Sequence, residues 1–560
     1  MTAQKRRALI QHAIALDAVV VATGVALLAR DSPLVILGSF LAAVVAVAWF
    51  GREELGLFAT GYSVVVLGLF FGDAVDVPAL TTLALAGAIT STFVRAVRRV
   101  RAPATTVEAE AAAPAPSFAP PSLPFTFVLP LLVVVVYTDV SDTIMRLYHI
   151  PSLLQPIIAL SAVAVWIGRE KFRPAEAMQF GAPIFFAVYA VVMLSTSIWA
   201  VDPSVTDGRV TEAVKALFIC VLVTSLAASW SALRRGLDAM VIAATFLSAI
   251  SVVQLTTGRF FTILGGLVEP QSGNIYGELA LPRASGPPVN DPNFYGRILL
   301  IAVPLAIALG IYEKRWPRRL AYFGAAAIVS AAVLFTYSRG AMLALGVVGV
   351  LLLLAMHISP KTIALAAAAG VVLLMLLPSE MAERRLSTLK TLAPGESSAR
   401  KDTSIEMRKL YALSAWKMFE THPLTGVGAG HFPLQYWRYA TRVGSSDYNY
   451  SPPGYHAFPH NIYLEVAAET GLPGVIAFFG AIATVFVTLR RAQWRLSRAG
   501  QRRQAFVVTG IAIAIAGYLA ASIFLHESHL RYFGLCLGFS CAAARLARHE
   551  EATPRPAPAA

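Results

Sequence analysis

Three ionisable side chains lie where polar loops meet apolar runs. Arg283 lies in "LPRASGPPVNDPNFYGR", Arg339 in "YSRGAMLALG" and His460 in "FPHNIYLE". A charge beside the hydrocarbon is costly and usually turns toward a partner or a water-filled cavity. Arginine presents a rigid fork of donors that matches phosphate oxygens, and histidine accepts a proton near neutral pH. The three residues therefore suit a site that binds an anionic lipid head group beside a proton acceptor.

Simpler interpretations exist for each of these groups. Arg339 could be an anchor that extends to the membrane interface, and Arg283 could be solvated in its loop. A single histidine at a helix start is more often structural than catalytic. Glu465 and Glu469 share one helical face four residues apart and could form only a solvated stripe.

Metal and nucleotide chemistry receive little support. One loop contains His422, His431, His456 and His460, but their spacing matches no common ligand signature. We therefore predict no metal ligand. The chain also has no glycine-rich nucleotide-binding loop.

Composition indicates a polytopic, all-α integral membrane protein. Hydrophobic residues make up 57% of the 560 and charged residues only 14%, which is more apolar surface than one soluble core could bury. Apolar runs of about 17 to 22 residues, each long enough to cross the hydrocarbon core, predict about 16 transmembrane helices (range about 12 to 16). They lie near 9–29, 33–50, 54–71, 78–97, 124–139, 152–168, 180–199, 210–229, 238–256, 295–312, 319–337, 340–357, 361–378, 471–489, 505–525 and 530–546.

Basic residues predict the orientation of these helices, because short loops rich in Lys and Arg stay cytoplasmic. Such residues recur after every second run, and the intervening loops, such as "FGDAVDVP" and "WAVDPSVTDG", contain few of them. Both termini are predicted to be cytoplasmic. The net charge of +14 is explained by this pattern, so nucleic acid is not a predicted partner.

The chain divides into six predicted segments. A four-helix membrane segment (1–99) and an Ala/Pro-rich cytoplasmic linker (100–123) precede a membrane core (124–378). A large, partly helical periplasmic loop (379–470), C-terminal membrane helices (471–546) and a cytoplasmic tail (547–560) follow. Within the loop, helical spacing predicts a helix over 404–420 and a short surface helix over 459–470.

An ordered set of motifs resembles the O-antigen ligase and O-antigen polymerase superfamily of bacterial envelope glycosyltransferases. The motifs cover roughly residues 180 to 490 and are "STSIWAVDP", "PRASGPPVNDPNFYG", "YSRGAMLALGVVGVLLLL", "MRKLYALSAWKMFETHPLTGVGAGHF" and "HNIYLEVAAETGLPGVIAFF". The leading helices and the linker lie outside the resemblance.

This resemblance implies glycan transfer at the periplasmic face of the bacterial inner membrane. The donor is a glycan linked to undecaprenyl pyrophosphate, and transfer inverts the anomeric carbon without a nucleotide sugar, cofactor or required metal. Matched motif positions imply that Arg339 and Arg283 hold the pyrophosphate and that His460 binds or deprotonates the acceptor. Further candidate substrate-binding residues on these motifs are Arg408, Asn293, Asn461 and Glu469, of which Glu469 could also act as the base.

Four functions are weighed against these features. The first is a polymerase of O-antigen or exopolysaccharide repeat units, and its nearest alternative is a ligase that transfers the finished glycan to lipid A core, as in lipopolysaccharide, or to another acceptor. A protein O-oligosaccharyltransferase is a third. A transporter of lipid-linked oligosaccharide would place its charges at the bilayer midplane, whereas these lie at the outer boundary. A flippase and a chain-length regulator are possible partners of a polymerase.

Overall fold

The protein is described from a computed structural model, which describes residues 127–141, 154–168, 173–258, 267–272, 282–311, 313–356, 403–443, 457–526 and 530–552. The helices are α6 (Val128–Thr138), α8 (Leu154–Ile167), η2 (Pro174–Gln179), α10 (Gly181–Ser195), η3 (Thr196–Ile198), α11 (Pro203–Leu226), α12 (Trp230–Thr257), α13 (Pro292–Ile311), α14 (Trp316–Phe335), α15 (Arg339–Met356), α18 (Thr403–Thr421), α19 (Phe432–Val443), α20 (Ile462–Arg498), α21 (Arg502–Ala521), η6 (Ser522–Phe524) and α22 (Arg531–Ala552). Two short strands, β1 (Gln271–Ser272) and β2 (Pro282–Arg283), pair antiparallel.

The predicted membrane helices agree with this structure wherever it describes them. Each apolar run that falls on described residues coincides with a helix. Six helices in the described part are long and apolar enough to cross a membrane, so the chain is an all-α membrane protein. The runs at 9–29, 33–50, 54–71, 78–97 and 361–378 lie outside the described residues, as does the linker, and the total of about 16 helices stays a prediction.

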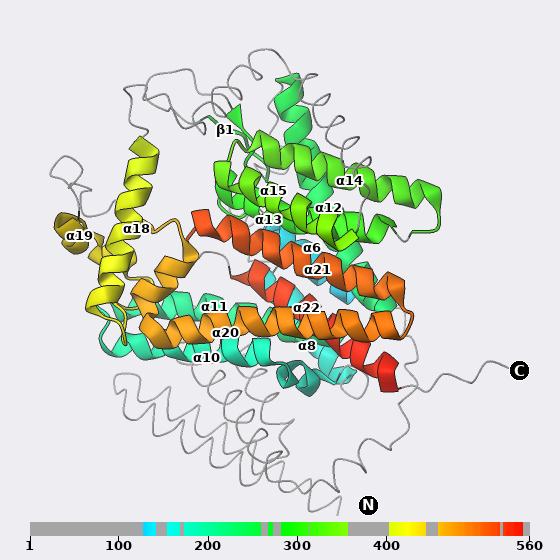
Figure 1. The fold of residues 1–560 in the computed structure, drawn as a ribbon, viewed down its shortest axis with the longest axis horizontal. Helices are drawn as coiled ribbons and strands as arrows, with labels where there is room; N and C mark the ends of the chain where they lie inside the picture. The colour runs from blue at the N-terminus through cyan, green and yellow to red at the C-terminus, as the bar shows by residue number, and fades with distance from the viewer. Residues whose placement is uncertain are drawn as a thin grey trace, which may run out of the picture.

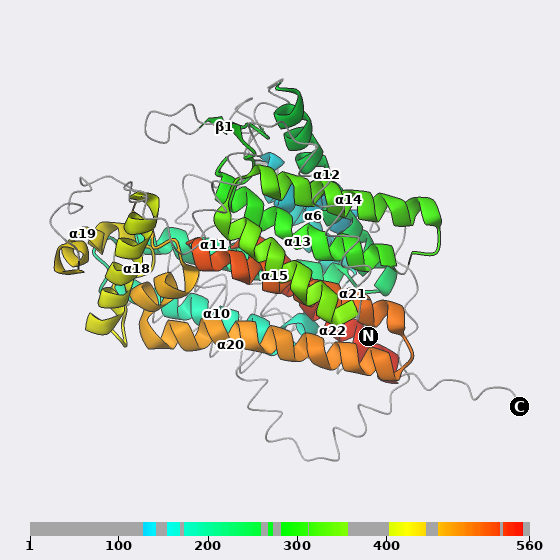
Figure 2. The same cartoon turned by 45° about the horizontal axis from the view of Figure 1, so that its top comes forward.

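The long helices pack side by side as a bundle (Figure 1). One group joins α10 to α20 and α11 to α22, and a second joins α13 to α14 and α21. Figure 2 shows α15 lying across α13 and α21. Helices α18 and α19 lie at one end of the bundle, beside the start of α20.

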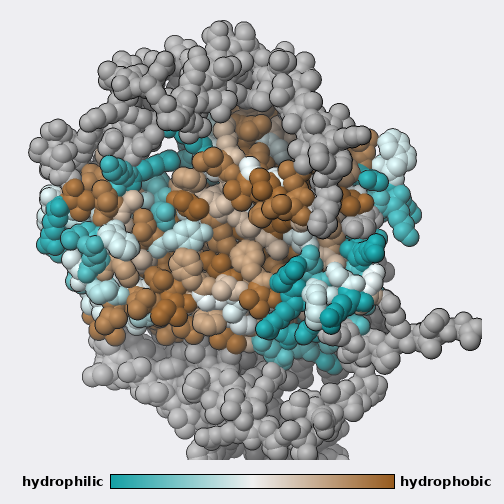
Figure 3. Space-filling view, in the orientation of Figure 1, coloured by the Kyte–Doolittle hydropathy of each residue, from teal (hydrophilic) through white to brown (hydrophobic). Residues whose placement is uncertain are grey.

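The surface of this bundle carries an apolar band between two polar zones. Figure 3 shows the band over the middle of the long helices, with hydrophilic residues at the α18–α19 end and at the opposite end. At the opposite end, the Glu313 carboxylate forms an ion pair with Arg234 and lies 3.9 Å from Arg503. The Tyr322 hydroxyl donates to Asp238 there at 2.7 Å. This distribution is typical of a bundle that crosses a bilayer with its helices roughly parallel.

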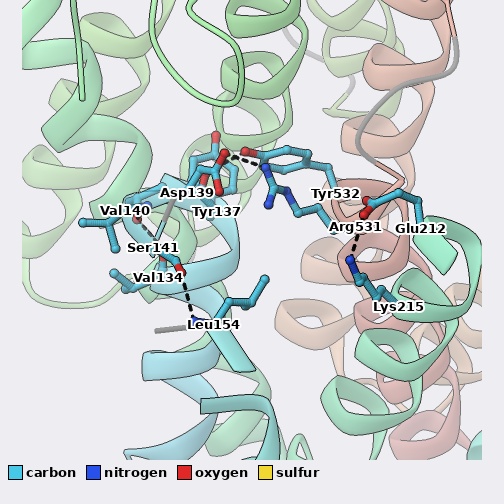
Figure 4. A network of polar contacts seen from close by, with 11 residues as sticks. Val134, Tyr137, Asp139, Val140, Ser141, Leu154, Glu212, Lys215, Arg531 and Tyr532 are labelled. Atoms are coloured by element: carbon cyan, nitrogen blue, oxygen red, sulfur yellow. Dashed lines mark hydrogen bonds and ion pairs between the residues drawn. The ribbon is translucent and has the colours of Figure 1, made fainter. Parts of the chain in front are cut away.

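A buried ion pair fixes the ends of α6 and α22 (Figure 4). Asp139 Oδ2 lies 2.6 Å from Arg531 Nη2, and the residues are 3% and 9% exposed. Beside them, the Tyr137 hydroxyl donates to the Ile298 carbonyl at 2.9 Å and the Tyr532 hydroxyl to the Tyr137 carbonyl at 3.2 Å. These contacts connect α6, α13 and α22 near the end of the bundle from which α13 starts.

Helix α20 contains a break at Gly471. Its φ of 64° and ψ of −165° are not helical, so a short helix over 462–470 is followed by a long one over 472–498. A Cβ at Gly471 would lie 2.8 Å from the backbone of Leu424, and its positive φ favours glycine. The break redirects the chain from the polar end into the bundle.

Candidate functional site

The turn over residues 422–432 clasps the break in α20. Val427 N–H donates to the Ala468 carbonyl at 2.9 Å, and Leu472 N–H donates to the Pro423 carbonyl at 2.7 Å. A Cβ at Gly426, where φ is 65°, would lie 2.2 Å from the Glu469 carbonyl oxygen. The glycines of this motif therefore allow two backbones to touch.

The side chain of Glu469 completes this clasp. It is 2% exposed, and its two carboxylate oxygens accept the N–H groups of Gly430 at 2.6 Å and Phe432 at 3.0 Å. Glu465, 1% exposed, lies 3.5 Å from Arg209 on α11. The interpretation of both glutamates as a solvated stripe is wrong, because both are buried. In this structure the carboxylate of Glu469 holds the turn, and its role toward substrate stays a prediction.

The "STSIWAVDP" motif and Thr206 of α11 bind the other side of the same turn. Ala429 N–H donates to the Thr196 hydroxyl at 2.9 Å, and the Thr206 hydroxyl donates to the Ala429 carbonyl at 3.2 Å. Asp202 N–H donates to His431 Nε2 at 3.1 Å, so His431 carries its proton on Nδ1, 2.9 Å from the Ala429 carbonyl. His431 is fully buried and has a structural role. Among the described residues, no three His, Cys, Asp or Glu side chains cluster as metal ligands would.

Arg283 docks on the turn that precedes Arg339. Its Nε donates to the Thr336 carbonyl at 2.8 Å, and Ala284 N–H donates to the Phe335 carbonyl at 2.9 Å. Arg339 begins α15 three residues after Thr336, and its side chain is exposed. The structure therefore attaches the "PRASG" loop to the "YSRG" turn, as a shared site for the two arginines requires.

Arg283 and His460 also share their charged surroundings. Burial, helped by Arg408 and opposed by Asp291, lowers the pKa of His460 from 6.5 to about 4. Burial likewise lowers the pKa of Arg283, Asp291 opposes this, and Arg408 adds to it. Because Arg408 and Asp291 act on both groups, α18, the "PRASG" loop and the start of α20 converge at one place.

Two other predicted residues, Asn293 and Asn461, lie at the starts of α13 and α20. Asp291 caps α13, where its Oδ1 accepts Asn293 N–H at 2.7 Å and Phe294 N–H at 3.1 Å. The Asn461 side chain caps α20, accepting the N–H groups of Tyr463 and Leu464, both at 3.0 Å. Caps of this kind satisfy donors that a helix start leaves open. Binding of substrate by Asn293 and Asn461 stays a prediction.

Backbone strain gathers at the three motif turns. Asn290, Tyr337 and His460 have φ values of 52°, 50° and 48°, in a region that L-residues adopt at a cost of about 1–3 kcal/mol. They lie in the "VNDPN", "YSRG" and "FPHN" motifs respectively. Strain that recurs where charged groups meet is a feature of binding and catalytic sites.

The ring of His460 is held mainly by other rings. The centroid of Tyr411 lies 5.9 Å away and that of His526 lies 5.6 Å away. Its Nδ1 is buried and has no hydrogen-bond partner among the described residues. A neutral imidazole of this kind keeps a lone pair that can accept a proton.

Sequence reasoning missed Asp291, Arg297 and His526. The motif "NDPN" carried the signal for Asp291, because Asp before a proline-started helix is a typical N-cap. Arg297 lies inside an apolar helix, and a charged residue in such a helix is by that position a candidate functional residue. His526 lies outside every motif that carries the resemblance, and no local signal connects it to His460.

The helices and this site define a multi-pass membrane protein with arginines and a neutral histidine gathered at one end of its bundle. A family model described as O-antigen ligase matches residues 324–479, from α14 to the first part of α20, and includes Arg339, Arg408 and His460. The match supports the O-antigen ligase and polymerase superfamily that the motifs predicted, and with it a membrane enzyme of glycosyltransferase type. A search of curated protein sequences found no match to the chain.

Proposed function

We propose that the protein polymerises glycan repeat units carried on undecaprenyl pyrophosphate at the periplasmic face of the inner membrane. The product would be O-antigen or exopolysaccharide, and each step would invert the anomeric carbon. The observation that carries the proposal is the convergence of Arg283, Arg408 and the low-pKa His460 around Asp291. Positive charge and a neutral base thus lie together, as transfer from a pyrophosphate donor requires.

The arginines would stabilise the leaving group. As the acceptor oxygen bonds to the anomeric carbon, the bond from that carbon to the pyrophosphate oxygen breaks, and negative charge grows on the departing lipid pyrophosphate. Arg283, Arg408 and Arg339 would donate to these oxygens. Fixed donors in a water-poor site contribute about 3–4 kcal/mol each to the transition state.

His460 would accept the proton of the acceptor hydroxyl. Its pKa of about 4 keeps the imidazole neutral at physiological pH, so the base form is always present. A base with so low a pKa is weak, and it acts because the hydroxyl becomes acidic only as its bond to carbon forms. The low pKa also prevents a histidinium ion from forming an ion pair with the pyrophosphate before the acceptor arrives.

Purified protein with lipid-linked repeat units tests this proposal. We expect a ladder of carrier-linked oligomers from the wild type and at least about a 100-fold loss in Arg283→Ala and His460→Ala. Arg438→Ala is the matched control, because Arg438 lies on α19 at the same end and, within the described part of the chain, its guanidinium contacts Trp437 and Gln435. A normal ladder from His460→Ala would refute the assignment of the base.

A ligase is the second candidate, and the description of the matching family model favours it. Lipid-linked intermediates from cells that lack the gene separate the two. Single repeat units on the carrier would indicate a polymerase. Long carrier-linked polymer beside a bare acceptor would indicate a ligase, with the same residues in the same chemical roles.

A further inference from the structure

His526 reaches the site from the opposite side of the bundle end. It follows η6, in the connection between α21 and α22, and is 9% exposed. Figure 1 shows that the end of α21 lies close to the short first part of α20. The connection after α21 therefore delivers a second histidine beside His460.

The ring of His526 is fixed on several sides. Phe458 stacks on it with centroids 4.1 Å apart and planes 7° apart, and Phe294 meets it edge to face at 4.9 Å. His460 meets it at 5.6 Å with an interplanar angle of 81°. Phe458 lies two residues before His460 and Phe294 lies three after Asp291, so these rings connect both motif turns through His526.

Arg297 anchors the backbone that carries His526. It is 1% exposed, and its Nη1 lies 3.4 Å from the His526 carbonyl and from the Ser522 hydroxyl. Its guanidinium lies 4.9 Å from the ring centroids of Phe294 and Tyr518. A buried cation is retained only where carbonyls, hydroxyls and aromatic faces replace water. Here those groups come from α13, α21 and the turn at His526.

Bases in enzymes are generally oriented by a third group, commonly a carboxylate or carbonyl that accepts their second ring proton. His460 has no such contact at Nδ1 among the described residues, and its backbone is held at a strained φ of 48°. Within the part of the chain that the structure describes, ring packing is what sets its orientation. Tyr411 contacts the ring from α18, and His526 contacts it from the α21 side.

We propose that His526 is a positioning residue that fixes the orientation of the His460 ring by edge-to-face packing, with Arg297 anchoring its backbone. This inference rests on the proposed role of His460 as the base. A flat ring at position 526 is what this edge-to-face arrangement requires. Phenylalanine at this position should therefore serve and alanine should not.

Turnover by purified full-length variants tests the inference first. We expect His526→Ala to lower kcat by about 100-fold, since a base misplaced by about 1 Å loses that much, while KM for the lipid-linked donor changes less than about threefold. His526→Phe should keep kcat within about fivefold of wild type, with the acid limb of its pH profile unmoved. His549→Ala, on the last turn of α22 at the other end of the bundle, is the matched control and should behave as wild type.

A second readout does not depend on turnover. In protein labelled at histidine, the signal of the His460 ring, assigned by its loss in His460→Ala, should broaden or split in His526→Ala and stay single in His526→Phe. Wild-type kcat or an unchanged His460 signal in His526→Ala overturns the positioning role, as does an inactive but folded His526→Phe. Full activity of His460→Ala would instead refute the proposed function, while the ring signals would still report whether His526 orients His460.

Discussion

The acid limb of the pH profile tests the electrostatics of the site. A lowering of the His460 pKa from 6.5 to about 4 corresponds to about 3 kcal/mol of preference for the neutral ring. At pH 6 the ring would then be about 1% protonated, whereas a histidine with an unshifted pKa would be about three-quarters protonated. Under the proposed role of His460 as the base, the neutral ring is the active form, so kcat/KM should stay level from pH 8 to about 5 and fall as pH decreases through about 4.

Two variants should move this limb in opposite directions. Arg408 lowers the pKa of His460 and Asp291 raises it. Arg408→Gln removes a positive neighbour, so the acid limb should move to higher pH. Asp291→Asn removes a negative neighbour, so the limb should move to lower pH, and asparagine keeps the cap on α13 because it is a favourable N-cap residue.

The assay is kcat/KM for glycan transfer by purified protein in lipid nanodiscs between pH 3.5 and 9. Titration of the donor is common to all three proteins, so differences between their limbs report the enzyme alone. Circular dichroism at each pH separates loss of base from unfolding. A wild-type limb near pH 6.5, or limbs that move the same way in both variants, would refute the reasoning.

Other predictions concern the contacts that hold the site. Arg531→Met should cost about 3–5 kcal/mol by removing the guanidinium that faces the buried Asp139 carboxylate, and adding Asp139→Asn should restore most of this. Unfolding in mixed detergent micelles measures both, and equal stability of the single and double variants would contradict the role of the pair. Gly426→Ala should cost at least about 1–3 kcal/mol because of its positive φ, plus the clash with the backbone at Glu469. Gly324→Ala on α14, where a Cβ meets nothing within 4 Å, should be neutral or stabilising by up to about 1 kcal/mol, and a matching loss there would point to a general effect of the substitution. Glu469→Gln places a donor group against an N–H group and should lower the melting temperature through a loss of about 1–3 kcal/mol; an unchanged melting temperature with lost transfer would support a role in substrate binding instead.

Local patterns carried much of the fold. Apolar runs predicted the helices because a bilayer demands a fixed length of apolar chain, and the helix predicted over 404–420 is observed as Thr403–Thr421. Helix α11 begins at Pro203 instead of near 210, because the Asp202 side chain caps a polar first turn. Helix α19 was missed, although Phe432, Tyr436, Tyr439 and Ala440 are spaced for one buried helical face.

Contacts between distant segments could not be predicted from one sequence. The partner of Asp139 lies 392 residues away, and apolar periodicity carries no information about which helices become neighbours. The sequence predicted that Arg283, Arg339 and His460 lie at the same end, because the alternation of basic loops assigns their three segments to the same side of the membrane. It could not assign Glu469 to the clasp, because the acceptor role of that carboxylate depends on two N–H groups from another segment.

The clasp over 422–432 has a consequence for biosynthesis. The hydrogen bond between Thr196 and Ala429 can form only after 233 further residues have been synthesised. At a translation rate of roughly 5–20 residues per second this takes about 12–47 s. During that time the ribosome-bound chain holds α10 and α11 without the turn that later joins them. His460 follows still later, and His526 after it. Under the proposed function, a nascent chain that stalls before that point lacks the base of the reaction and therefore cannot transfer glycan.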